Sequence, residues 1–308
     1  MGKLYQKYIS NFSCLANKCS DTCCANWQIC IDEKTAKAYL ADGGEIGRVA
    51  RECMRGKIYN AHLLLKNKRC PYLTENNLCR VIELKGEQSL SKVCSMHPRF
   101  SHSLFEDEFE FLSLSCPQSV TMFLSALKES GIAYAKEDLQ NPYLSQFYDY
   151  VCDIFEHFKQ INVVKEMENE CKIADDITKL FSSVFTKMEY LEEQTETALK
   201  SISFADFENG YNAFYSTYGS GFFAELFKYF ALVLYNEKSP VLPVAFIFSL
   251  AVCALYSKLD SYDKAIYKFV KEVEHSERNI KSAIRIMRSP KAKTILSKSF
   301  CFSLLFSE

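Results

Sequence analysis

The chain has 308 residues, of which 48% are hydrophobic and 24% charged, and this excludes a disordered, collagen-like or low-complexity protein. Its 37 basic and 38 acidic residues give a formal net charge of -1, so nucleic acid is not an expected partner. Only 10 glycines and 7 prolines indicate long helices rather than many short strands. The unusual count is that of cysteine, with 14 residues.

The start of the chain lacks the apolar segment of a secretory signal, so export is not indicated. The most apolar stretch, residues 240–256, carries no charge and is near the short limit for a membrane span. Pro243 lies inside it and no anchoring pattern flanks it, so we interpret it as a buried helix. We therefore expect a cytoplasmic protein with no membrane partner, where a cysteine cluster indicates metal or redox chemistry rather than disulfides.

The first predicted elements lie among the cysteines. Residues 27–31 favour a short strand, and Asp32 can cap a helix over residues 34–40. Asp42-Gly43-Gly44 ends that helix.

A β-hairpin is predicted further along, over residues 99–115, where Phe109 and Phe111 alternate on one face. Cys116-Pro117 closes the hairpin, and residues 118–128 begin a helix.

In the second half of the chain, apolar residues recur with the period of an α-helix. Ser203 and Asp206 form a start like a capping box, and Gly219-Ser220-Gly221 interrupts the helix before an apolar helix over residues 222–235. An aromatic stripe follows the capping box, and we interpret it as a helix–helix seam, the alternative being an aromatic wall for a purine ring or a substrate side chain. The stripe consists of Phe204, Phe207, Tyr211, Phe214 and Tyr218.

The C-terminal region is basic, with ten Lys or Arg against three acids over residues 264–298. Lys281, Arg285 and Arg288 share one helix face, opposite a face with Ile280, Ile284 and Met287. We interpret the basic face as solvated. The alternative is contact with an acidic partner or RNA, which the net charge does not support.

The cysteines are concentrated near the start, where ten of the 14 lie in residues 1–116. The other four, Cys152, Cys171, Cys253 and Cys301, are interpreted as small core residues. We therefore predict a Cys-rich metal-binding module over residues 1–137 and a helical domain over residues 138–308. The expected fold is mainly α with a small β-hairpin, the module being packed on the helical half.

Eight cysteines form the candidate metal-ligand set: Cys14, Cys19, Cys23, Cys24, Cys70, Cys79, Cys94 and Cys116. Spacings such as Cys19-x3-Cys23 suit a structural zinc site, whereas a cubane iron–sulfur cluster suits a Cys-only set from distant segments. Cys23 and Cys24 are adjacent, so either they serve different sites or one is not a ligand. One cluster needs four thiols, and spacing does not select them. Cys30 and Cys53 lie outside the series and are expected not to be ligands.

Other site types are poorly supported. No phosphate-binding P-loop and no Gly-x-Gly-x-x-Gly fingerprint occurs. Cys94 and His97 could form a nucleophile pair, but no separate group that would orient the histidine is evident.

The order of the motifs points to a known family. They are Phe12-Ser13-Cys14, Cys19-Ser20-Asp21-Thr22-Cys23-Cys24, Trp27-Gln28-Ile29, Cys70-Pro71-Tyr72-Leu73, Leu78-Cys79, Cys94-Ser95-Met96-His97-Pro98-Arg99 and Leu114-Ser115-Cys116-Pro117. Over roughly the first 120 residues this series resembles the flagellin lysine-N-methylase family and, more distantly, small Cys-rich zinc- or iron-chelating proteins. His97 stands where an aromatic such as Tyr is expected.

The resemblance implies methyl transfer from S-adenosylmethionine to lysines of flagellin, by a protein that carries a Cys-ligated iron–sulfur cluster of the 4Fe-4S type, with zinc as the alternative metal. It assigns no catalytic residue and no cofactor-binding residue. Near the motifs, Asp21 is interpreted as a turn residue and Asp32 as a helix cap. His97 is interpreted as a core or hydrogen-bonding residue and Arg99 as a carboxylate partner.

Two other functions stay open from the residues alone. One is a metal-binding or electron-transfer protein with no methyl chemistry. The other is a zinc-stabilised interaction module whose basic C-terminal helices hold a partner.

Overall fold

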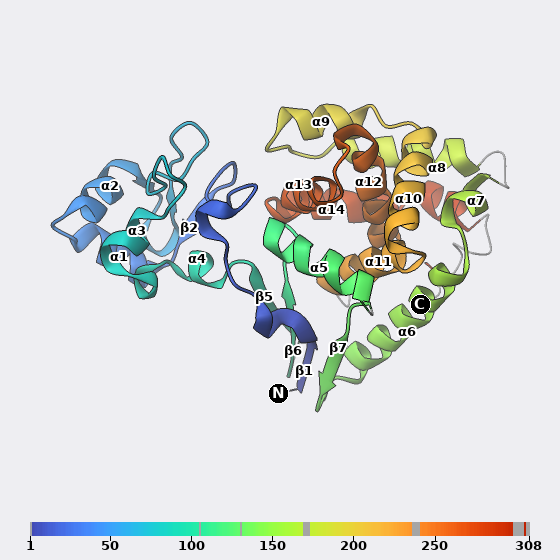
Figure 1. Ribbon diagram of the computed structural model, residues 1–308, viewed down its shortest axis with the longest axis horizontal. Helices are drawn as coiled ribbons and strands as arrows, with labels where there is room; N and C mark the ends of the chain where they lie inside the picture. Colours follow the sequence, from blue (N-terminus) through green and yellow to red (C-terminus); the bar gives the residue numbers. More distant parts are fainter. Residues whose placement is uncertain are drawn as a thin grey trace.

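The computed structural model describes residues 2–104, 106–129, 131–168, 173–235, 241–297 and 305. Figure 1 shows a small lobe, here called the thiol lobe (residues 24–96), beside a larger helical body formed by residues 2–12 and 99–296. The prediction of a mainly helical fold is confirmed.

The body contains one four-stranded sheet with strand order β5-β6-β1-β7. The predicted hairpin is confirmed as the antiparallel pair β5–β6, and Phe109 and Phe111 are buried. The hairpin is not isolated, however, because β1 pairs with β6 in parallel and β7 pairs with β1. Asp107 helps to hold β1, since its Oδ1 accepts a 3.0 Å hydrogen bond from Gly2 N. The strands are β1 (Gly2–Gln6), β5 (Arg99–Leu104), β6 (Asp107–Leu112) and β7 (Tyr134–Glu137).

The thiol lobe combines short helices with a three-stranded sheet of order β2-β4-β3. Asp32 caps α1 as predicted, accepting a hydrogen bond from Thr35 N at 3.0 Å, and the helix ends before the predicted Asp42-Gly43-Gly44 stop. The lobe elements are β2 (Ile29–Ile31), α1 (Glu33–Ala41), α2 (Glu45–Cys53), β3 (Met54–Arg55), β4 (Ala61–Leu63), α3 (Arg80–Lys85) and α4 (Lys92–Met96).

The helical body is built around α11 and α12, which are almost entirely buried. Its helices are α5 (Pro117–Glu129), α6 (Pro142–Gln160), α7 (Val163–Glu168), α8 (Ile173–Phe185), α9 (Glu193–Lys200), α10 (Phe204–Tyr218), α11 (Gly221–Val233), α12 (Leu242–Leu259), α13 (Tyr262–Glu274), α14 (Glu277–Met287) and α15 (Pro290–Leu296). Short 3-10 turns occur at Lys7–Asn11, Ala16–Lys18, Ile58–Asn60 and Glu87–Ser89.

The aromatic stripe forms a helix–helix seam, as predicted, along most of its length. The capping box of Ser203 and Asp206 starts α10, and Phe207, Tyr211 and Phe214 are buried. The seam is close because a Cβ on Gly210 would lie 1.7 Å from the carbonyl oxygen of Cys253 in α12, so only glycine fits there.

Among the described residues, one helix, α12, is long and apolar enough to cross a membrane by length and composition. Because 78% of its apolar window is buried inside the protein, the prediction of a buried core helix is confirmed. The basic face of α14 is exposed, as predicted, while Met287 is buried and Ile280 and Ile284 pack against the core.

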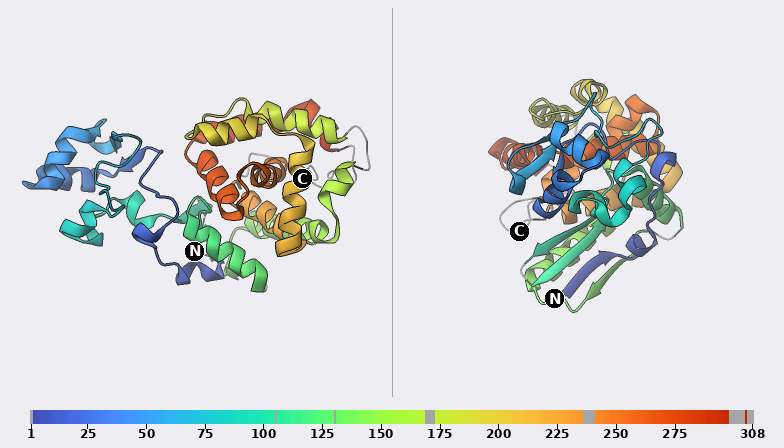
Figure 2. Two further views of the ribbon diagram at one scale, coloured as in Figure 1. Left: turned by 45° about the horizontal axis from the view of Figure 1, so that its top comes forward. Right: turned by 90° about the vertical axis from the view of Figure 1, so that its left-hand side faces the viewer.

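Three hydrophobic cores occur among the described residues. One lies within the thiol lobe, a larger one joins Leu4, the hairpin and the helices from α5 onward, and a small third one consists of Phe12, Leu112 and Cys116. The chain thus leaves the body after its first strand, forms the lobe, and returns at β5 (Figure 2). The cores do not divide the chain at residue 137, where the domain boundary is predicted. The division into two independent domains stays a prediction.

Candidate functional site

Four of the predicted ligands meet in the thiol lobe, and we call Cys24, Cys70, Cys79 and Cys94 the first thiol group. Cys70 belongs to the buried lobe core and the other three pack against it. Cys70 N donates a 2.7 Å hydrogen bond to the carbonyl oxygen of Cys24. Burial raises the pKa of Cys70 to about 12 and that of Cys94 to about 11, and neighbouring thiols of the group add to both shifts. All six pairs within the group interact in this way.

Backbone N–H groups favour the thiolate forms of Cys70 and Cys79. Burial raises the pKa of Cys79, but the N–H groups of Ile82 and Val81 at the start of α3 oppose that shift. The N–H of Tyr72 does the same at Cys70. Hydrogen bonds to sulfur and a nearby helix N-terminus stabilise the thiolate, which is the form that binds metal.

Three more thiols, Cys14, Cys19 and Cys116, lie close to one another, and we call them the second thiol group. Burial raises the pKa of Cys19, and the charges of Cys116 and Cys14 add to the shift. Cys116 is buried beside Phe12 directly before α5, where backbone N–H groups again approach its sulfur.

Cys23 interacts with thiols of both groups. Its thiol hydrogen-bonds the sulfur of Cys24, which raises the pKa of Cys23 and, against burial, lowers that of Cys24 to about 7. The charges of Cys14 and Cys94, one from each group, also act on Cys23. The adjacent pair is therefore the point where the two groups approach each other.

All cysteines that the structure describes are free thiols. In the same part of the chain, no three Cys, His, Asp or Glu side chains are gathered tightly enough to hold one metal ion. Zinc–sulfur bonds of 2.3 Å require sulfurs roughly 4 Å apart, whereas a cubane carries its thiolates on separate corners. The donor type fits an iron–sulfur cluster, and the metal centre stays a prediction.

The remaining cysteines differ in burial. Cys253 is fully buried in α12, which matches its interpretation as a small core residue, and Cys152 is half-buried. Cys171 and Cys301 lie outside the described residues. In the lobe, Cys30 is exposed on β2 and Cys53 is buried at the end of α2.

A lysine from the helical body reaches into the cysteine motifs. The ammonium of Lys271 in α13 lies 3.0 Å from Asp21 Oδ2 and donates a 3.2 Å hydrogen bond to the carbonyl oxygen of Thr22. It also stands 5.5 Å from the ring centre of Trp27. Because the Lys271 side chain is only 4% exposed, this positive charge is held beside the thiols and contributes to the lowered pKa of Cys24.

The charged residues near the motifs have structural contacts. Asp21 accepts a hydrogen bond from Thr22 N, as expected of a turn residue, and Asp32 is the predicted cap. His97 packs edge-to-face on Trp27, and burial lowers its pKa to about 4. Arg99 was predicted to pair with a carboxylate. Instead it donates to the carbonyl oxygen of Phe12 at 2.9 Å and lies over that ring, because the chain returns to the body here.

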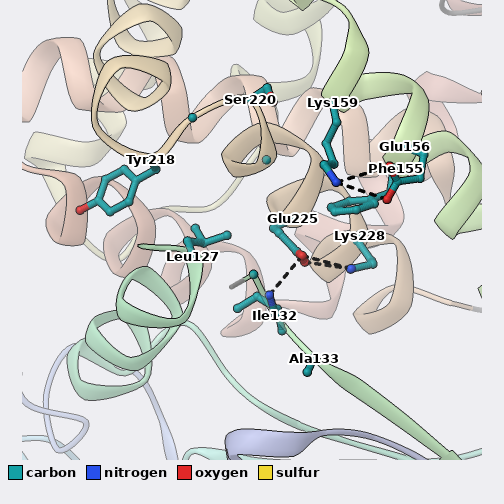
Figure 3. A pocket seen from close by; sticks show the side chains of 13 residues that line it. Leu127, Ile132, Ala133, Phe155, Glu156, Lys159, Tyr218, Ser220, Glu225 and Lys228 are labelled. Atoms are coloured by element: carbon teal, nitrogen blue, oxygen red, sulfur yellow. Dashed lines mark hydrogen bonds and ion pairs between the residues drawn. The ribbon is translucent and has the colours of Figure 1, made fainter. Parts of the chain in front are cut away.

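The helical body also contains a cavity of about 520 Å³, which no sequence pattern predicted. Glu225 and Lys228 form an ion pair on its wall, and Phe155 of α6 lies beside them (Figure 3). The sequence offered one signal for this cavity. Glu225 and Lys228 are two charged residues, three positions apart, in the otherwise apolar segment 222–235. The lining residues are Leu127, Gly131, Ile132, Ala133, Phe155, Glu156, Lys159, Tyr218, Gly219, Ser220, Gly221, Glu225 and Lys228.

Comparison with known proteins yields three informative relatives. The chain is 35% identical over 132 residues to the flagellar biosynthetic protein FliU of Salmonella muenchen, covering 38% of this chain and 74% of FliU. It is 32% identical over 133 residues to proteins named lysine-N-methylase from Salmonella choleraesuis (strain SC-B67) and Salmonella typhimurium (strain LT2). Each of those matches covers 38% of this chain and 31% of the relative.

No protein-family model and no solved structure matches the chain. The chain thus spans about a third of the length of the two lysine-N-methylases, but most of FliU. Together with the ordered cysteine motifs, this coverage shows that the chain belongs to the flagellin lysine-N-methylase family, to which FliU is related.

Proposed function

We propose that this protein is an S-adenosylmethionine-dependent lysine N-methyltransferase that acts on flagellin and carries a Cys-ligated iron–sulfur cluster. The observation that carries the proposal is the identity to proteins named lysine-N-methylase and to FliU. Free thiols in both groups suit the reducing cytoplasm in which we expect it to act.

The proposed reaction transfers a methyl group from a sulfonium to the ε-amine of lysine. The carbon–sulfur bond breaks as the nitrogen–carbon bond forms, leaving a neutral thioether. The attacking amine must have lost its proton first, because an ammonium has no lone pair. The site must therefore hold amine, methyl and sulfur in line and supply a group that accepts the proton.

The first thiol group is the best fit to the cluster. Its four sulfurs come from four separate segments, interact pairwise, and receive backbone N–H groups at Cys70 and Cys79. A bound cluster would supply covalent links among the four segments. We propose a structural role for it because methyl transfer from a sulfonium requires no electron. Lys271 places a buried positive charge beside this group, which would offset the negative charge of its thiolates.

Activity can be tested with the purified full chain and S-adenosylmethionine carrying a labelled methyl group. Incubation with the flagellin of the same organism should place label on lysine, which peptide mass spectrometry would locate. Flagellin with those lysines replaced by arginine is the matched control. Absence of label from protein whose metal content is intact would contradict the proposed activity.

Metal identity is a separate test. Protein purified without oxygen should contain iron and sulfide, and Cys70→Ser or Cys94→Ser should remove most of the iron. Cys30→Ser changes an exposed thiol of the same lobe and should retain it. Zinc without iron in the unmodified protein would favour the zinc-stabilised interaction module.

A further inference from the structure

The thiol lobe carries most of the large apolar side chains that are exposed on the described surface. Seven of the eleven such side chains belong to residues 24–96, although the lobe is the smaller of the two regions. Tyr59 is 66% exposed and Leu64 is 51% exposed. Single exposed apolar residues are ordinary, whereas several on one face mark an interaction site. The positions of these two residues in the fold therefore decide what they mean.

Both residues belong to the antiparallel pair β3–β4, which has one face toward the lobe core and one face outward. Arg55 of β3 lies opposite His62 of β4, and the next residue along β4, Leu63, is buried in the core. Because side chains alternate along a strand, Arg55 and Leu64 lie on the outward face. The turn that joins the strands, residues 56–60, is exposed throughout. We call the resulting patch the β3–β4 surface, and it consists of Arg55, Lys57, Ile58, Tyr59 and Leu64.

The β3–β4 surface carries positive charge that no carboxylate of the described chain neutralises. Residues 53–74 contain five Lys or Arg and no Asp or Glu. Arg55 Nη1 donates hydrogen bonds to two backbone carbonyl oxygens, at 2.8 and 2.9 Å, which fix the guanidinium and leave its charge in place. The Lys57 ammonium stands 5.7 Å from the ring centre of Tyr59. Glu52, the nearest acid before the strand, already pairs with other basic residues.

The basic face of α14 differs from the β3–β4 surface in both respects. Lys281 pairs with Glu277 at 2.7 Å, and Arg278 pairs with Glu189 at 2.5 Å. All residues of α14 are described, and none of its large apolar side chains is exposed. Cations of α14 thus have partners within the chain, whereas those of the β3–β4 surface stand beside exposed apolar groups and lack a carboxylate partner among the described residues.

We propose that the β3–β4 surface binds an acidic segment of a partner protein, an interaction that does not depend on the proposed methyl transfer. Carboxylates of the partner would accept hydrogen bonds from the other N–H groups of Arg55 and would pair with Lys57. Apolar side chains of the partner would cover Tyr59, and arginine and tyrosine are the residue types enriched at protein interfaces. The exposed aliphatic side chains of Ile58 and Leu64 favour protein over nucleic acid, which is held through its phosphates and base faces.

The test is titration of the full chain into a short fluorescent peptide in which leucines stand among glutamates, followed by fluorescence anisotropy. The acidic peptide should bind saturably, and the same peptide with glutamine in place of glutamate should bind at least about tenfold more weakly. Hydrogen exchange should slow over residues 54–64 when the acidic peptide is bound. Absence of saturable binding would overturn the proposal, and so would slowing confined to other parts of the chain.

Charge removal at two places shows whether binding is local. Arg55→Gln with Lys57→Gln should weaken binding of the acidic peptide at least about tenfold. Lys281→Gln with Arg285→Gln removes the same charge from α14 and is the matched control, which should bind like the unmodified chain. Equal weakening by both pairs would show that binding follows net charge alone, and the β3–β4 surface would lose its assignment.

A third variant tests the apolar contact. Tyr59→Ser with Leu64→Ser changes two exposed side chains, so the melting temperature should be retained while binding weakens by about fivefold or more. Unchanged affinity, or tighter binding of a single-stranded oligonucleotide of equal charge, would overturn the choice of a protein partner. Methyl transfer to flagellin is measured separately, so label on lysine without peptide binding would remove this proposal alone.

Discussion

The thiol lobe and the helical body are stabilised by different means. Residues 24–96 contain none of the chain's 24 phenylalanines, and the lobe core is a small cluster of aliphatic, tyrosine and cysteine side chains. The body buries phenylalanines in one continuous core around α11 and α12. Small cores need cross-links or metals, whereas a large apolar core stabilises itself. From this comparison we predict that the lobe depends on its thiols for stability and that the body does not.

Metal removal should produce the largest difference between the two regions. Chelation under reducing conditions, or Cys70→Ser, should unfold the lobe, because a structural thiolate site contributes about 10 kcal/mol or more to such domains. Hydrogen exchange followed by mass spectrometry should show lost protection over residues 24–96 and retained protection in α11 and α12. Cys30→Ser is the control. If the lobe stayed protected from exchange without metal, the predicted difference between lobe and body would be wrong.

A core substitution should have the reverse effect. Phe227→Ala removes a fully buried ring whose centre lies 5.0 Å from that of Phe158, and it should cost about 4 kcal/mol of unfolding free energy. Denaturant unfolding would measure the loss, and metal content should be unchanged. Tyr143→Ala, at a residue 67% exposed, should cost under about 1 kcal/mol. Loss of metal from the Phe227→Ala protein would show that the two regions are strongly coupled.

Glu274 makes the stability of the helical body sensitive to pH. It is buried at the end of α13, where Ser113 and Tyr229 donate hydrogen bonds to it, and burial raises its pKa from 4.5 to about 7. The folded state holds the proton of Glu274 more tightly than the unfolded state does. The protonated carboxyl therefore stabilises the folded state fully below pH 4.5, and this stabilisation is lost as the pH rises through 7. Glu274→Gln should therefore reduce the fall in unfolding free energy between pH 5 and pH 8 by about 3 kcal/mol.

Denaturant unfolding at the two pH values would measure that change. Some pH dependence should remain, because burial also raises the pKa of Glu272 to about 7. Glu277→Gln, at a side chain 79% exposed, is the control and should leave the pH profile unaltered. An identical profile for the Glu274→Gln variant would show that the carboxyl is not protonated in the folded protein.

The contact of Lys271 should have the smallest effect of the four. Lys271→Met removes the ion pair with Asp21 and should cost about 2 kcal/mol, reduced from the value for a fully buried pair because Asp21 is 20% exposed. Hydrogen exchange should quicken over residues 21–27 with little change in the lobe core. Lys281→Met, at an exposed ion pair on α14, should leave that exchange unchanged. Unaltered exchange in the Lys271→Met protein would exclude this lysine as a link between lobe and body.

Local patterns predicted several elements well. Asp32 was placed correctly at the start of α1, and Ser203 with Asp206 at the start of α10, because a helix cap is a contact between residues three positions apart. The hairpin β5–β6 was equally predictable from the sequence, because its two strands follow each other closely along the chain. The parallel pairing of β1 with β6 was not, because it joins segments about a hundred residues apart.

Local residue patterns were thus sufficient for the helical character, the cysteine motifs and the family relationship, which all depend on neighbouring residues. Packing alone decided that eight candidate thiols fall into two groups with Cys23 interacting with both, that Lys271 reaches Asp21, and that Glu225 faces a cavity. These contacts join positions up to 250 residues apart. They depend on how whole helices and sheets bury their apolar faces, which no local spacing encodes.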